Sequence, residues 1–150
     1  MLSLIASLVV IVILGNKLHE KILLSQKRLD LPDSENVYKI YFMHGAQWYA
    51  ELTDTEYITQ IMESLSNARA TNITNYYDIA LGIQYTGIIY YLDENGESQS
   101  KSFDVSRENK KYYIYFVEYG WPEGEVWQID DELYQLLFET TMKLRAGELD

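Results

Sequence analysis

The hydrophobic pattern of this chain opens with an apolar run from Leu2 to Gly15 that contains no charged residue. As a helix, these 14 residues would span about 21 Å, at ~1.5 Å per residue, against a bilayer hydrocarbon core of about 30 Å. Extension to Leu18, with the Lys17 ammonium reaching the headgroups, adds about 5 Å. A buried amphipathic helix would carry a polar stripe, and this run has none. The pattern predicts an N-terminal membrane-anchor helix.

The signals that would direct removal of this run are missing. A secretory cleavage site needs an A-x-A-like pair of small residues, whereas the run ends in Leu-Gly-Asn-Lys-Leu-His. A lipoprotein would need a cysteine, and the chain has none. We therefore expect residues 1–18 to remain as a membrane anchor or uncleaved signal. Residues 19–35 would form a tether, with helical spacing up to about Leu29 and an end at Pro32.

The stretch 37–52 changes to an alternating pattern, with apolar residues on both faces. It predicts two short strands joined near His44 and Gly45. The stretch 53–67 then returns to helical spacing. Thr53 would be its N-cap, with a glutamate three residues later as in a capping box. The expected apolar stripe of this helix starts at Tyr57 or Ile58 and continues with Ile61, Met62 and Leu65.

Two hairpins are predicted between residues 83 and 129. The first should turn at Asn95-Gly96, since both residues tolerate the positive φ of a type I′ turn. The second should turn at residues 121–124, where Trp-Pro-Glu-Gly suits a type I turn.

The last helix is predicted to begin after Asp130, a good N-cap followed by two further acids at the positive helix end. Glu139 and Lys143 are spaced as an i,i+4 ion pair. Its expected apolar face consists of Leu133, Leu136, Leu137, Thr140 and Leu144.

These elements define the expected fold class. Hairpins favour antiparallel pairing, and two amphipathic helices require a sheet to cover. We expect an acidic α+β domain over residues 36–150, with an antiparallel sheet of about six strands and two helices packed on one side. The membrane-anchor helix precedes it.

Charge narrows the choice of partner. Residues 36–150 hold 8 of the 12 bases and 19 of the 23 acids, so the net charge of -11 lies entirely in the domain. A surface this acidic repels phosphate backbones, which argues against nucleic acid as a partner. The same field repels anionic lipid, so membrane contact is expected from residues 1–18 alone. A basic protein remains a suitable partner.

Catalytic chemistry is sparse in the sequence. The chain contains only two histidines, His19 and His44, and no nucleotide-binding, nucleophile-elbow or zinc-protease motif. The acidic stretch from Asp93 to Glu97 lacks the ligand spacing of a calcium-binding loop. Paired carboxylates could serve a glycosidase, but chance pairs are expected among 23 acids. We therefore expect no enzymatic activity, no cofactor and no metal.

The most distinctive stretch is VEYGWPEGEVWQIDDE, in which two tryptophans stand among acids. As a recognition loop, it would offer aromatic contact area and select a basic partner. The alternative places Trp127 in the core and Trp121 over a hairpin end. The candidate interaction surface consists of Glu118, Trp121, Glu123 and Glu125.

Several segments together carry a family resemblance: NVYKIYF, the helix ending IMESLSNARAT, the tyrosine-rich hairpin, KKYYIYF and IDDELYQLL. Over roughly residues 36–140, the chain resembles small signal- or anchor-bearing Firmicutes domains of unknown function. The resemblance implies an extracytoplasmic domain and no activity. The chain departs from many anchored relatives in lacking the lipobox cysteine.

The leading hypothesis is a non-enzymatic interaction domain, tethered to the cell membrane by a single span and facing outward. The first alternative is an acidic immunity or inhibitor protein that binds a basic partner at the membrane, on either face; the second is a small hydrolase. Bases that follow the apolar run favour a cytoplasmic domain under the positive-inside rule. Cleavage of the run would instead give a secreted protein.

Overall fold

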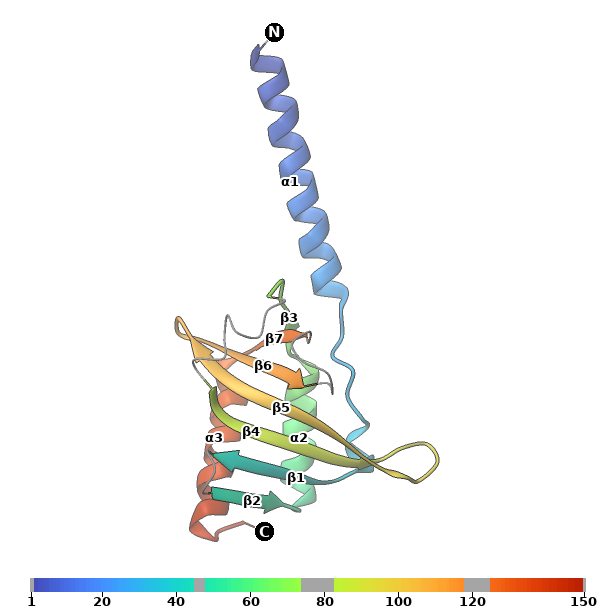
Figure 1. The fold of residues 1–150 in the computed structure, drawn as a ribbon, viewed down its shortest axis with the longest axis vertical. Coiled ribbons are helices and arrows are strands. Elements are labelled where there is room, and N and C mark those ends of the chain that lie inside the picture. The colour runs from blue at the N-terminus through green and yellow to red at the C-terminus, as the bar shows by residue number, and fades with distance from the viewer. Residues whose placement is uncertain (1, 45–47, 74–82, 118–124, 150) are drawn as a thin grey trace.

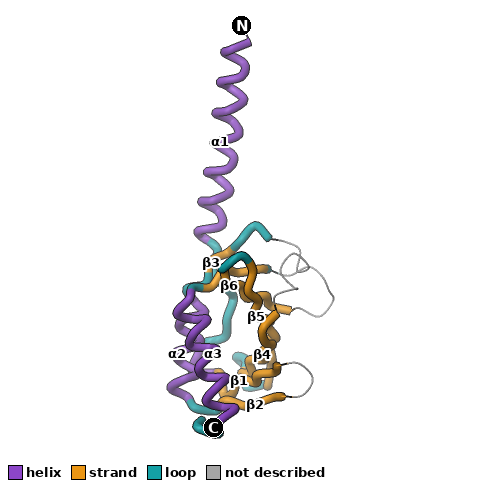
Figure 2. Tube along the Cα trace, turned by 90° about the vertical axis from the view of Figure 1, so that its left-hand side faces the viewer, coloured by secondary structure: helices purple, strands orange, loops and turns teal. Residues whose placement is uncertain are grey.

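The computed structural model describes residues 2–44, 48–73, 83–117 and 125–149. It is an α+β structure in which a seven-stranded antiparallel sheet is covered on one face by two helices, with a third helix projecting from one end (Figures 1 and 2). The helices are α1 (Leu2–Gln26), α2 (Thr55–Ser66) and α3 (Asp131–Ala146), and a 3-10 turn, η1, spans Ser34–Asn36. The strands are β1 (Val37–His44), β2 (Trp48–Leu52), β3 (Arg69–Ala70), β4 (Ile83–Leu92), β5 (Ser98–Glu108), β6 (Lys111–Val117) and β7 (Val126–Ile129).

The sheet has the order β2-β1-β4-β5-β6-β7-β3. All six strands expected from the sequence are present, and the predicted number was one too low. The additional strand is β3, which pairs Arg69 with Gln128 and Ala70 with Trp127 at the outer edge of β7. A strand of two residues is too short to show an alternating pattern, so only its pairing with β7 reveals it.

The main core lies between the sheet and the layer of α2 and α3. Alternate residues of β1, such as Ile40 and Phe42, point into it, and the ring of Phe103 on β5 is nearly perpendicular to that of Phe42. Trp127 is 1% exposed in this core, as the alternative interpretation of the two tryptophans expected. The stripe predicted for α2 is buried, with Ile58 and not the partly buried Tyr57 as its first member. The predicted face of α3 packs against the same core.

Part of the opposite sheet face is also covered. Tyr113, Tyr115 and Val126 are buried there and pack with Ile73, which follows β3. The covered part belongs to β6 and β7, so it lies toward the β3 edge of the sheet. The half of this face formed by β2, β1 and β4 keeps partly exposed side chains.

The ends of the helices agree with the sequence in most places. Asp130 caps α3 by accepting a hydrogen bond from the Leu133 amide at 2.8 Å. The N-cap of α2 is Asp54 and not Thr53, because the Asp54 carboxylate accepts from two amides of the first turn. Lys143 was expected to pair with Glu139. Its ammonium instead donates a hydrogen bond to the Tyr57 hydroxyl on α2.

The hairpin turns differ from their predictions. Only Gly96 of the Asn95-Gly96 pair has a positive φ, and its amide donates to the Asp93 carbonyl at 2.9 Å. This geometry is a type I turn followed by a left-handed glycine, not a type I′ turn. A type I′ turn occurs between β5 and β6, where both Asn109 and Lys110 have positive φ. The turn predicted at 121–124 lies outside the described residues.

Helix α1 continues past the predicted anchor into the tether and ends at Gln26. It stands away from the sheet along most of its length and touches the domain only near its end (Figure 1). Its described apolar side chains are exposed, and they include Val12, Ile13, Leu14, Leu18, Ile22 and Leu23. Within the described parts of the chain, no helix meets the length and hydropathy that a membrane span requires, so the anchor stays a prediction.

Candidate functional site

The surface predicted from the sequence is only partly described. Glu118, Trp121 and Glu123 lie outside the described residues, while Glu125 stands just before β7. Its exposed carboxylate forms an ion pair with Lys27, one residue beyond α1. The structure therefore places this end of the predicted surface beside the base of α1.

A second surface, which we call the tyrosine face, lies toward the β2 edge of the sheet, on the face opposite α2 and α3. It consists of Tyr38, Lys39, Tyr41, Tyr49, Glu51 and Tyr90, from β1, β2 and β4. Register explains its position. Ile40 and Leu52 are paired across the sheet and point into the core, so their neighbours point to the face that no described helix covers. Tyr38 departs from this alternation, because a bulge lies between Val37 and Lys39.

Aromatic contacts organise the tyrosine face. The rings of Tyr41 and Tyr49 stack across the two strands, with 5.6 Å between centroids and 19° between planes. Tyr38 approaches Tyr90 with 6.3 Å between ring centroids. Tyr49 is 70% exposed, which is unusual for so large a side chain already stacked on a neighbour. The cluster thus presents rigid aromatic area to the outside.

One ion pair lies among these rings. The Lys39 ammonium is 3.1 Å from a carboxylate oxygen of Glu51 and 4.9 Å from the centroid of Tyr90. The hydrogen bond to Glu51 raises the pKa of Lys39, so this ammonium stays protonated. Burial, and then Tyr49, raises the pKa of Tyr41, which keeps that phenol neutral. The face is therefore aromatic and neutral overall, within an acidic domain.

Sequence reasoning missed this face for a definable reason. The alternating pattern placed Tyr38 and Tyr41 among the apolar residues on the two faces of one strand. A pattern within one strand does not indicate which strands lie side by side. Strand β4 is 39 residues beyond β1 from end to start and still pairs with it directly, Lys39 opposite Tyr90. The signal that could have found the face is the number of tyrosines, 14 against 4 phenylalanines, because Tyr suits half-exposed strand positions.

A small apolar hollow of about 160 Å³ lies between the start of β4 and α3. Tyr85, Tyr134 and Phe138 line it together with Met142 and Arg145. Burial raises the pKa of Tyr85 well above its ordinary value, and its hydroxyl has no hydrogen-bond partner within the described structure. This lining combines no nucleophile with a base, so the hollow offers no catalytic pair.

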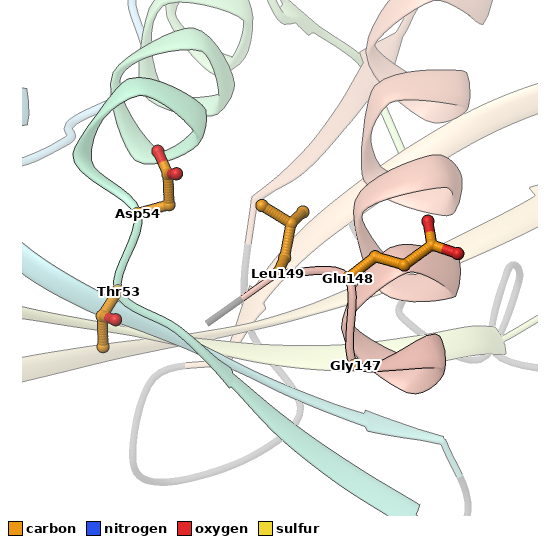
Figure 3. Close-up of a pocket in the computed structure, with 5 residues that line it drawn as sticks. All are labelled: Thr53, Asp54, Gly147, Glu148 and Leu149. Carbon is orange, nitrogen blue, oxygen red and sulfur yellow. The ribbon is translucent and has the colours of Figure 1, made fainter.

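A second hollow, of about 300 Å³, lies between the start of α2 and the end of α3 (Figure 3). Its two carboxylates do not converge. Asp54 points toward α2, whose first amides it caps, while Glu148 extends along α3 (Figure 3). General acid and base groups must reach one substrate together, and these two carboxylates point to different helices.

No group of three or more His, Cys, Asp or Glu side chains gathers as metal ligands in the described residues. Comparison of the chain with family models, with curated proteins and with solved structures finds no match. The candidate site therefore rests on geometry, and the tyrosine face is the strongest of the surfaces described.

Proposed function

We propose that this protein is a membrane-tethered, non-enzymatic domain that binds a protein partner through its tyrosine face. The observation that carries the proposal is the stacked pair of half-buried Tyr41 and exposed Tyr49, on the half of the sheet that no described helix covers. Aromatic residues with few rotamers are enriched at protein interfaces, because they supply contact area at low entropic cost.

The partner that fits best is a protein with a basic surface. The domain carries the whole net charge of -11, which accelerates encounter with a basic protein. Tyrosine rings also accept cations on their faces, as Lys39 does on Tyr90 in this structure. Arginine or lysine side chains of a partner can stack on Tyr49 in the same way.

The arrangement of the sheet suits a tethered binder. Helix α1 contacts the β3 edge, while the tyrosine face occupies the strands at the β2 edge. The uncharged run of α1 and the exposed apolar side chains within and after it support insertion of this helix into a bilayer. A domain held in this way presents its tyrosine face away from the membrane.

The resemblance to extracytoplasmic domains supports an outward-facing domain. The strong acidity equally fits an immunity or inhibitor protein, which would use the same face against a basic toxin or enzyme at the membrane. A reporter fused after Asp150 distinguishes a domain outside the membrane from a domain on its cytoplasmic side. Activity of a periplasmic-type reporter supports the outward domain, and activity of a cytoplasmic-type reporter supports the reverse.

Site-specific photocrosslinking tests the binding proposal. A photoreactive phenylalanine analogue replaces Tyr49 in the full chain, expressed in its own cell membrane. The matched control replaces Phe138, an exposed aromatic residue on α3. We expect a discrete adduct with a basic protein from position 49 only, weakened by salt. Adducts of equal yield from both positions, or an acidic partner, would contradict the proposal.

A further inference from the structure

A groove of about 500 Å³ lies where α1 ends beside the connection from α2 to β3. Both views show the lower end of α1 over β3 (Figures 1 and 2). We call it the basic groove, because Lys21, Lys27, Arg28 and Arg69 line it and no carboxylate does. Four cations in one groove are unexpected in a chain of net charge -11.

These cations are only partly neutralised. Lys27 pairs with Glu125 at the rim, and one amino nitrogen of Arg28 donates to the carbonyls of Ser25 and Lys27, at 3.2 and 3.1 Å. A guanidinium has five N–H donors, so Arg28 keeps others. Lys21 and Arg69 form no hydrogen bond or ion pair with any described residue. The groove is therefore ready for an anion.

The groove is held in place by the segment that follows α1. Leu29 and Leu31 pack against the core of the domain. Between them, the carboxylate of Asp30 lies 3.2 Å from the Lys101 ammonium on β5. This segment therefore fixes the end of α1 relative to Arg69 instead of letting it swing freely.

The position of the groove along the chain indicates which anion it meets. The headgroup layer adds about 5 to 7 Å on each side of the hydrocarbon core. With the expected anchor, residues 1–18, in the bilayer, Lys21 lies three residues beyond its end, or about 4.5 Å of helix. Lys21 then stands within the headgroup layer, and the groove opens at the level of the phosphates.

We propose that the basic groove binds the phosphate headgroup of an anionic phospholipid, an inference that rests on the proposed membrane tether. Lys21 and Arg69 supply the charges that no described residue pairs with, and the planar donors of Arg69 match phosphate oxygens in a bidentate contact. The sequence-based expectation confined membrane contact to residues 1–18. Arg69 makes the folded domain itself part of that contact, and so orients the sheet relative to the membrane.

Lysine labelling in vesicles tests this proposal. The full chain is reconstituted in phosphatidylcholine vesicles with or without phosphatidylglycerol, and a pulse of acylating reagent is read by mass spectrometry. We expect Lys21 to react about fivefold more slowly in the anionic vesicles. Arg69→Gln should remove most of this protection. The control Arg107→Gln, which makes the same charge change on β5, should retain it.

The outcomes separate the groove from the tether. Equal labelling of Lys21 in both vesicles, or equal effects of the two variants, overturns the groove. If inorganic phosphate with neutral vesicles gives the same Arg69-dependent protection, the anion comes from solution and the lipid assignment is wrong. A chain that fails to float with phosphatidylcholine vesicles contradicts the tether. In that case, flotation with phosphatidylglycerol vesicles tests the groove separately. The groove proposal holds only if Arg69→Gln reduces the fraction of the chain that floats.

Discussion

Lys143 on α3 donates a hydrogen bond to the Tyr57 hydroxyl on α2, with 2.7 Å between the two atoms. The same ammonium lies 5.1 Å from the centroid of the Tyr57 ring. The two helices that cover the sheet are thus joined by a polar contact at the rim of their apolar packing.

The first prediction concerns this contact and pH. The bond to Tyr57 raises the pKa of Lys143 above its ordinary 10.5, so the folded state holds this proton more tightly than the unfolded chain. The stabilisation is therefore complete below pH 10.5 and is lost as the pH rises through the folded pKa. Lys143→Met should unfold at lower urea than the native chain at neutral pH, and the difference should vanish at high pH.

Tyr57→Phe supplies the control for that experiment. It keeps the ring and removes the hydroxyl, so combining it with Lys143→Met should cost little more than either change alone. Additive losses in the double variant would show that the two side chains do not act as a pair.

The second prediction concerns Gly87 on β4. A Cβ at this position would lie 2.1 Å from the Phe103 ring on the neighbouring strand. Phe103 is completely buried and cannot move aside without disturbing the core. Gly87→Ala should reduce the free energy of unfolding by about 1–3 kcal/mol, measured by urea unfolding.

A second variant checks that the Phe103 ring is the cause. Gly87→Ala combined with Phe103→Leu should lose less stability than the sum of the single changes, because the smaller side chain leaves room for the methyl group. Gly15→Ala is the matched control, since nothing lies within 4 Å of its Cβ position, and it should not reduce stability. Additive losses at 87 and 103 would argue against the contact.

The third prediction concerns the type I′ turn between β5 and β6. Lys110 has a φ of 63° there, a left-handed conformation that costs an L-residue roughly 1 kcal/mol. Lys110→Gly should therefore raise the free energy of unfolding by about 0.5–1 kcal/mol. Asn95→Gly is the comparison, because Asn95 does not have a positive φ and gains nothing from glycine. Equal effects at both positions would contradict the assigned turn types.

These two turns show where sequence patterns succeed and fail. The hairpin from β4 to β5 was predicted from Asn95-Gly96, and the position of the turn is right although its type is wrong. Its geometry is set by Asp93, whose carboxylate accepts from the amides of Asn95 and Glu97. The turn at Asn109-Lys110 lacks a glycine, so no local signal marked it as type I′.

Contacts between distant segments account for what the sequence did not predict. Buried stripes and the Asp130 cap are local features, readable from spacing alone. By contrast, β3 exists through its pairing with β7, and the tyrosine face exists because β4 lies beside β1. The basic groove likewise needs Arg69 to meet the end of α1 across the fold. No periodicity within one segment encodes these neighbours.

The last prediction separates binding from stability at the tyrosine face. Tyr49 is 70% exposed, so Tyr49→Ala should change the free energy of unfolding by no more than about 0.5 kcal/mol. If Tyr49 is an interface anchor, the same change should weaken binding of the crosslinked partner by about 30-fold or more, the loss typical of a hot spot. Phe138→Ala removes an aromatic side chain that is 46% exposed on α3, away from the tyrosine face, and should leave the affinity unchanged. Calorimetric titration of the identified partner measures the affinity. Titration at two salt concentrations then separates the attraction to the acidic domain, which weakens with salt, from the aromatic contribution, which does not. A Tyr49→Ala variant that binds as well as the native chain would place the interface elsewhere, and the surface beside Glu125 would then be the next to test.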